Sequence, residues 1–204
     1  MNSPEFQAAL PFVLRWEGGF VDHPNDPGGA TNKGVTQAVY DGWRAQQGLA
    51  TRSVRLLASE EMHAIYDGAY WRAAFCPKLM QPLDLAQFDT AVNMGVGRAV
   101  RFLQKAVAAE IDGAFGPATE RCVASCDAGQ ALANYCQIRE ALYRQLVVKN
   151  PKLGVFLKGW MNRLNALRKE LGLPGFEAVG DEVDFGEPGY IARVPDIGQD
   201  PLYD

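Results

Sequence analysis

The feature that most constrains this chain is the helical repeat of apolar side chains between residues 153 and 171. Spacings of three and four residues keep these side chains on one face of a helix. Gly172 and Pro174 follow, and both residues are typical of a helix end. Such a face must be buried against other elements, so the segment predicts a helical core. Its members are Phe156, Leu157, Trp160, Met161, Leu164, Leu167 and Leu171.

The stretch from residue 98 to about 173 predicts helices joined by short turns. It opens with RAVRFLQKAVA and the turn IDGAFGPAT, and further helices are predicted near 117–126, 129–148 and 153–171. Residues 175–204 show no helical period and are rich in Gly, Pro and acids, which predicts an extended tail.

The first helix of residues 1–97 places a carboxylate on its apolar face. Ser3 is a suitable N-cap and Pro4 a suitable first helical residue. An inward stripe follows, and Glu17 lies on it, one turn before a Gly-Gly end. Pro11 predicts a kink or a late start of this helix. The stripe consists of Phe6, Leu10, Val13 and Glu17.

Two more helices are predicted before residue 98. Ser59 is expected to cap the first, which runs into YWRAAF. The second, DLAQFDTAVNMG, buries Leu85, Phe88 and Val92. Asp89 and Asn93 are four residues apart and form a polar stripe beside that apolar face.

The distribution of charge argues against nucleic-acid binding. Residues 1–174 carry a net charge of +3, whereas the tail carries −7. Without a dense Lys/Arg face, nucleic acid is a poor candidate partner, although a weakly basic body suits an anionic polymer such as a cell wall. No apolar run approaches the roughly 20 residues of a membrane span, and the N-terminus does not resemble a Sec signal peptide.

The sequence contains residue types that commonly bind metals or phosphate, but their spacing fits neither kind of site. The four cysteines form no CxxC pair and lie apart from the two histidines, which predicts free or buried thiols. The segment PGGATNKGVT lacks the spacing of a phosphate loop, and Pro24 interrupts a possible calcium loop that begins at Asp22. No metal or organic cofactor is therefore expected.

Glu17 is the first candidate for catalysis. Desolvation beside Trp16 and Phe20 would favour its protonated carboxyl. Cleavage of a glycosidic bond needs such a group, because the leaving oxygen must receive a proton. The alternative is a Glu in the last helical turn whose carboxyl lies in water.

Three segments resemble a known enzyme family. EGGFVDHPNDPGGATNKGVT, YDGAYW and FDTAVNMGVGRAVRFLQ closely resemble the N-acetylmuramidases of glycoside hydrolase family 108, which occur as phage endolysins and as secretion-associated muramidases. The resemblance covers residues 6 to about 97. LQKAVAAEIDGAFGPATERCV resembles the helical peptidoglycan-binding region that follows in this family.

The resemblance implies that Glu17 is the general acid. Phage-type lysozymes place an Asp nine residues after the catalytic Glu, and Asp26 meets that spacing. A Thr six residues further on is typical, but Asn32 stands there and Thr31 precedes it. Asp22 is a rival second carboxylate, and the alternative for Asp26 is an Asp-capped turn.

Other residues are candidates for binding the glycan. Tyr70 and Trp71 offer flat faces to sugar rings, although such a pair is more often core. Asn93 would hold an N-acetyl group or else cap its helix. Asp89 would support the cleft or form an internal hydrogen bond. Thr36 is included among the binding residues, but it could simply begin a helix.

We therefore expect a mainly α, lysozyme-like fold with a small irregular or β-containing loop region and an extended tail. The expected parts are a catalytic region (1–97), a peptidoglycan-binding region packed on it (98–174) and an acidic tail (175–204). The expected activity is hydrolysis of the bond between N-acetylmuramic acid and N-acetylglucosamine. The alternatives are a lytic transglycosylase and a wall-binding or secretion adaptor without activity.

The expected partners follow from this activity. They are the glycan strands of peptidoglycan and, for the tail, an immunity, holin or secretion partner, unless the tail is simply solvated. We expect a monomer without a membrane span that reaches the periplasm or cell wall through a holin or a secretion system.

Overall fold

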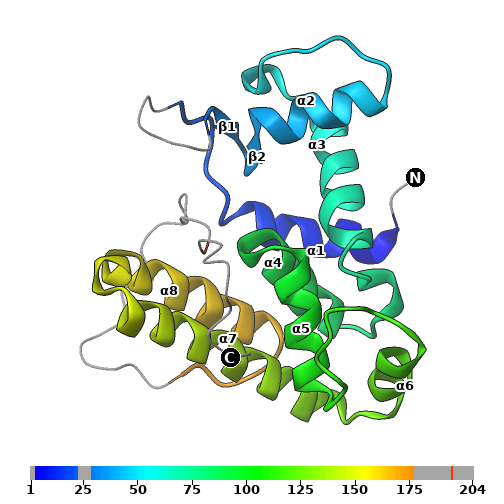
Figure 1. The fold of residues 1–204 in the computed structure, drawn as a ribbon, viewed down its shortest axis with the longest axis vertical. Coiled ribbons are helices and arrows are strands. Elements are labelled where there is room, and N and C mark those ends of the chain that lie inside the picture. Colours follow the sequence, from blue (N-terminus) through cyan, green and yellow to red (C-terminus); the bar gives the residue numbers. More distant parts are fainter. Residues whose placement is uncertain (1–2, 23–28, 177–193, 195–204) are drawn as a thin grey trace. The chain divides into compact units, whose positions relative to one another are not determined.

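The computed structural model describes residues 3–22, 29–176 and 194. The chain divides into two compact units, of which the first ends at Ala73 and the second begins at Ala74 (Figure 1). The described residues are mainly helical with one two-stranded sheet, which confirms the expected fold class. No helix among them is long and apolar enough to cross a membrane. The predicted tail lies outside these residues except for Gly175, Phe176 and Val194.

The first unit begins with helix α1 (Pro4–Leu14). The Ser3 hydroxyl accepts a hydrogen bond of 3.2 Å from the Phe6 N–H, as expected of an N-cap. The helix runs through Pro11, so the late start that Pro11 suggested is wrong. The reason is that the cap and the buried side chains of Phe6, Leu10 and Val13 outweigh one lost hydrogen bond.

A short hairpin and a second helix follow. Strands β1 (Thr31–Asn32) and β2 (Val35–Thr36) pair antiparallel, with Thr31 opposite Thr36 and Asn32 opposite Val35. Helix α2 (Gln37–Gln46) begins directly after β2 and was not predicted from the sequence. Its apolar positions are few, and Tyr40 and Arg44 are its buried residues.

The first unit closes with three helical elements. The 3₁₀ turn η1 (Val54–Leu56) precedes α3 (Ser59–Tyr66), which continues into the π-helical turn η2 (Asp67–Arg72). The predicted cap at Ser59 is wrong by one residue, because Ala58 is the N-cap. The Glu61 carboxylate accepts the Ala58 N–H at 3.1 Å, so a side chain from within the helix satisfies that donor.

The second unit consists of helices and short 3₁₀ turns. The predicted helices near 117–126, 129–148 and 153–171 appear within one residue of their predicted ends, as α6, α7 and α8. The elements are η3 (Cys76–Lys78), α4 (Leu83–Met94), α5 (Val96–Ala106), α6 (Pro117–Ser125), α7 (Ala128–Lys149), η4 (Pro151–Leu153) and α8 (Gly154–Glu170).

The division into compact units places α4 with the helices that follow it. Helix α4 lies in the second unit, where it packs mainly against α5 and α7. The four cysteines are free thiols, and Cys76 and Cys136 are buried.

The core of the second unit contains a buried ionic cluster. Asp89 on α4 accepts hydrogen bonds from Arg139 on α7 at 2.6 Å and from Arg163 on α8 at 2.9 Å. All three side chains are fully buried. The Tyr143 hydroxyl and the Thr90 hydroxyl also contact the Arg139 guanidinium, at 2.9 and 3.1 Å. The cluster joins three helices that are far apart in the sequence.

The charge of Asp89 is maintained by its partners. Burial by itself would raise the pKa of Asp89, but the charges and hydrogen bonds of Arg163 and Arg139 outweigh it and hold the pKa below its ordinary value. Because the folded pKa is lowered, this contribution to stability is present above the unfolded pKa of about 4. It is lost as the pH falls through the folded value.

The turn after α5 is held by one buried amide. The side chain of Gln104 is fully buried and donates to the Asp112 carboxylate at 2.7 Å and to the Ala114 carbonyl at 3.1 Å. Its oxygen accepts the Gly113 N–H at 2.8 Å. This amide fixes the turn that the sequence predicted between α5 and α6.

We predict that Asp89→Asn lowers the free energy of unfolding by about 3–5 kcal/mol, because it leaves two buried guanidinium groups without their counter-ion. Urea denaturation followed by circular dichroism measures this. Glu140→Gln on α7 is the control, since it breaks an exposed pair with Arg144 and should cost under about 1 kcal/mol. Equal unfolding midpoints for the two variants would contradict a structural role for the cluster.

Candidate functional site

Glu17 follows α1 and is buried. Its N–H donates to the Leu14 carbonyl at 3.3 Å, and the residue is 8% exposed. The expected helix end at Gly18 and Gly19 is wrong, because α1 ends at Leu14 and Glu17 is buried from the turn that follows it. Its carboxyl lies against the backbone of Gly34. A Cβ on Gly34 would be 2.5 Å from Glu17 Oε2 and 2.6 Å from the Tyr66 hydroxyl oxygen. A side chain at this position would therefore require the Glu17 carboxyl or the Tyr66 hydroxyl to shift.

Gly34 belongs to the turn of the hairpin. Lys33 and Gly34 both have positive φ, 46° and 73°, which is typical of the two-residue type I′ turn. The Tyr66 hydroxyl donates to the Lys33 carbonyl at 2.7 Å and so ties α3 to this turn. The sequence signal for the turn was the segment Asn32-Lys33-Gly34, whereas nothing in the sequence indicated the contribution of Tyr66.

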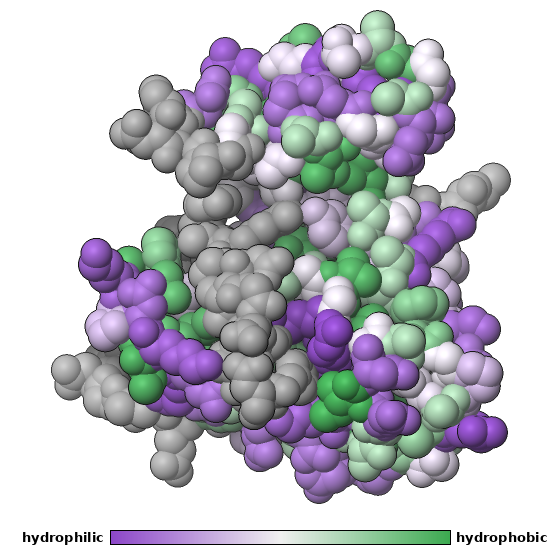
Figure 2. Space-filling model, in the orientation of Figure 1, coloured by the Kyte–Doolittle hydropathy of each residue, from purple (hydrophilic) through white to green (hydrophobic). Residues whose placement is uncertain are grey.

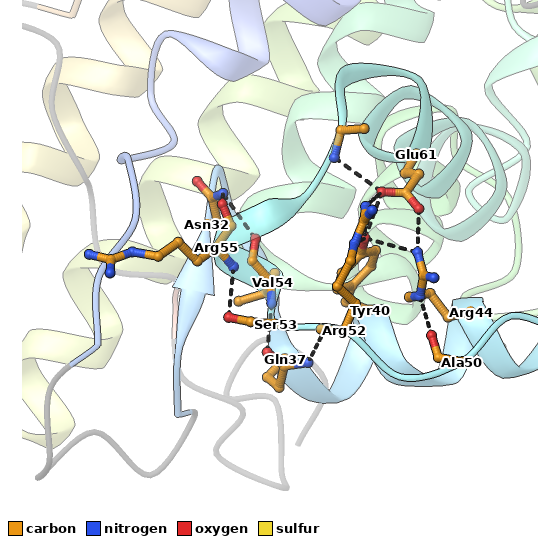
Figure 3. A network of polar contacts seen from close by, with 11 residues as sticks. Asn32, Gln37, Tyr40, Arg44, Ala50, Arg52, Ser53, Val54, Arg55 and Glu61 are labelled. Atoms are coloured by element: carbon orange, nitrogen blue, oxygen red, sulfur yellow. Dashed lines mark hydrogen bonds and ion pairs between the residues drawn. The ribbon is translucent and has the colours of Figure 1, made fainter.

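Asn32 holds the next segment of the chain against the hairpin. It is 9% exposed, and its amide nitrogen donates to the carbonyls of Val54 and Arg55 at 3.0 and 3.4 Å (Figure 3). Gln37 binds the same segment, because its oxygen accepts the Val54 N–H at 2.7 Å and its nitrogen donates to the Arg52 carbonyl at 2.9 Å. Both amides therefore position backbone.

A second set of contacts centres on Glu61. Its carboxylate accepts from Arg44 at 2.6 Å, from the Tyr40 hydroxyl at 2.6 Å and from Arg52 (Figure 3). Desolvation would raise the pKa of Glu61, but these partners and the Ala58 N–H hold the pKa below its ordinary value. The network anchors the loop after α2, because Arg44 also donates to the Ala50 carbonyl.

The remaining predicted residues of the loop have separate positions. Thr31 pairs with Val21 through two backbone hydrogen bonds of 2.8 Å, and Asp22 is exposed beside that bridge. Thr36 caps α2 by accepting the Val39 N–H at 3.3 Å, which fits the alternative that it begins a helix. Asp26 lies outside the described residues.

Tyr70 and Trp71 lie in η2. Trp71 is 1% exposed and packs against the ring of Phe6, with the ring centroids 5.8 Å apart. Tyr70 is 8% exposed and packs against Tyr66 at 5.4 Å. The alternative that this pair belongs to the core therefore fits Trp71, whose ring has no open face.

Asp89 and Asn93 belong to the second unit. Asp89 forms the internal ion pairs described above. The Asn93 oxygen accepts from the Tyr143 hydroxyl at 3.0 Å and from Arg139 at 3.4 Å. The Asn93 carbonyl accepts the Val194 N–H at 3.1 Å. Its buried amide nitrogen has no hydrogen-bond partner among the described residues.

The first unit also contains a groove of about 690 Å³ between α2 and α3. Its lining includes Val39, Trp43 and Ile65, whereas Glu17 does not take part. Figure 2 shows hydrophobic surface at α3 below the hydrophilic surface of α2. In the described part of the chain, no group of three or more acidic, His or Cys side chains is placed to hold a metal ion.

Comparisons with known proteins agree with this architecture. A family model described as Glycosyl hydrolase 108 matches residues 10–95, and one described as Predicted Peptidoglycan domain matches residues 98–165. The solved structure of SagA from Brucella abortus resembles the chain with a TM-score of 0.69 and 32% sequence identity. That match covers 86% of this chain and 98% of SagA. No curated protein matched the sequence.

We predict that Gly34→Ala destabilises the chain by at least about 1 kcal/mol more than Gly48→Ala. Both glycines have positive φ, 73° and 69°, so both variants carry a similar backbone cost of about 1–2 kcal/mol. A Cβ at Gly48 meets nothing within 4 Å, whereas one at Gly34 overlaps Glu17 and Tyr66. Urea denaturation compares the two. Equal losses would show that the turn does not press on Glu17.

Proposed function

This chain belongs to the glycosyl hydrolase 108 family, and we propose that it cleaves the β-1,4 bond between N-acetylmuramic acid and N-acetylglucosamine, with Glu17 as the general acid. Membership of the family confirms the resemblance seen in the sequence, and the protein is a glycoside hydrolase that acts on peptidoglycan. The bond and the catalytic residue are our proposal.

The observation that carries the proposal is the position of the Glu17 carboxyl. It is a buried acid held against the Gly34 backbone beside the Tyr66 hydroxyl. In the proposed reaction, Glu17 gives a proton to the glycosidic oxygen as the bond to the anomeric carbon breaks.

A second carboxylate completes the proposed mechanism. We assign to Asp26 the role of directing a water molecule at the anomeric carbon, because its spacing from Glu17 matches phage-type lysozymes, and we keep Asp22 as its rival. Under this assignment Asp26→Asn abolishes most lytic activity and Asp22→Asn does not. The opposite result would transfer the role to Asp22, which is exposed after the Val21–Thr31 bridge.

We predict that Glu17→Gln reduces lysis of purified peptidoglycan by at least about 100-fold, in the range of general acid catalysis, while the unfolding midpoint changes little. A turbidity assay on purified sacculi measures the loss. Glu5→Gln is the matched control, since Glu5 is an exposed acid in the first turn of α1, the helix that precedes Glu17. Full activity of the Glu17 variant would refute the assignment.

The products of digestion test the bond itself. Hydrolysis as proposed leaves reducing ends on N-acetylmuramic acid, which borohydride reduction and mass spectrometry detect. Reducing ends on N-acetylglucosamine would contradict the choice of bond. A 1,6-anhydro product would identify a lytic transglycosylase, and binding to sacculi without any released fragments would identify an adaptor.

A further inference from the structure

Arg55 is an exposed cation that the first unit holds in a defined position. Its N–H donates to the Ser53 hydroxyl at 3.3 Å, and its carbonyl accepts from Asn32 at 3.4 Å. The guanidinium lies over the ring of Phe20, 4.5 Å from the centroid. Figure 3 shows the side chain extending away from the other labelled residues. Backbone and side chain are therefore both fixed.

Among the described residues, Arg55 has no carboxylate partner of the kind that its neighbours have. Arg44 and Arg52 both bind the Glu61 carboxylate. Arg55 makes no ion pair with any carboxylate among the described residues, and the contact of its guanidinium is with the face of Phe20. A guanidinium stacked on an aromatic ring keeps its N–H groups pointing outward in its own plane, where they fit the two oxygens of a carboxylate.

The two residues that contact Arg55, Phe20 and Asn32, belong to the segments that surround Glu17. Phe20 follows Glu17 by three residues, across Gly18 and Gly19. Asn32 directly precedes the Lys33–Gly34 turn on which the Glu17 carboxyl lies. Both connections run within the first unit. A ligand bound by Arg55 would therefore be held relative to the proposed catalytic carboxyl.

The substrate offers a matching group. The sugar rings of peptidoglycan are neutral N-acetyl sugars, and the carboxyl groups belong to the muramyl residue. They are the lactyl carboxyl where the peptide is absent, and carboxyls of the attached peptide where it is present. We propose that Arg55, stacked on Phe20, forms a carboxylate-binding subsite for the muramyl residue. This inference rests on the proposed function. The subsite would allow the enzyme to distinguish peptidoglycan from uncharged glycans such as chitin.

Binding to the full chain carrying Glu17→Gln tests the subsite without cleavage. The probes are a muramyl-peptide disaccharide, a peptide-free tetrasaccharide of N-acetylglucosamine and N-acetylmuramic acid with free lactyl carboxyls, and chitotetraose. Adding Arg55→Gln should weaken binding of at least one carboxylate probe by about tenfold at low salt, with a smaller effect at high salt. Chitotetraose should bind unchanged. The probe that loses affinity identifies the lactyl or the peptide carboxyl as the ligand.

Two further variants separate a specific contact from net charge. Lys78→Gln removes the same charge from an exposed position in η3, outside the residues that the peptidoglycan-domain model matches, and should leave all three affinities unchanged. Arg55→Lys keeps the charge but loses the planar fork, so it should bind the carboxylate probe with intermediate affinity.

Two outcomes would overturn the subsite alone. They are unchanged affinities in Arg55→Gln, and an equal loss for chitotetraose, which would indicate a structural effect. A different result would overturn the proposed function and this inference together: no binding of any probe by the parent protein, and no fragments released from sacculi by the unsubstituted chain.

Discussion

The contact between the Glu17 carboxyl and the backbone of Gly34 is the constraint on which the first unit depends. A side chain at residue 34 would overlap the carboxyl, and the positive φ of 73° also favours glycine there. Tyr66 holds the turn from α3, and Asn32 joins the hairpin to the backbone of residues 54 and 55. The carboxyl thus lies beside a turn that hydrogen bonds from Tyr66 and Asn32 hold in place. That matters for proton transfer, because a displacement of about 1 Å can cost about 100-fold in rate.

In the second unit, the ionic cluster fixes the packing of three helices. Their apolar faces alone would allow several packings. The charge of Asp89 requires Arg139 and Arg163 together, and these residues lie 50 and 74 positions further along the chain. Replacing such a cluster with apolar residues is often neutral or stabilising, so its presence is poor evidence for stability as such. We interpret it as a device for specificity, since only one arrangement of α4, α7 and α8 satisfies all three charges.

The sequence predicted features that depend on local pattern. The spacing of Phe6, Leu10 and Val13 predicted the buried face of α1, although that helix ends at Leu14, before Glu17. The apolar repeat of α8 located that helix within one residue at each end. The prediction from the sequence failed for α2, because its few buried positions give no strong helical period of apolar residues. It also failed for the N-cap of α3, where the Glu61 side chain accepts the N–H of Ala58 from inside the helix. It also could not reveal which distant residues meet. The pairing of Tyr66 with Lys33 depends on tertiary packing rather than on spacing, and so does that of Asp89 with its arginines.

The segment from Arg52 to Arg55 shows how the first unit uses its polar groups. Outside its short 3₁₀ turn this segment has no regular secondary structure. Hydrogen bonds with the side chains of Asn32, Gln37 and Glu61 hold it in place instead of backbone pairing in a sheet. Those bonds neutralise Arg52, whereas Arg55 makes no ion pair with a carboxylate among the described residues. A carboxylate partner at an exposed position would have added under about 1 kcal/mol to the stability of the fold. The lack of such a partner in the described part of the chain therefore costs the fold little, and the planar guanidinium offers its donors to an anionic ligand.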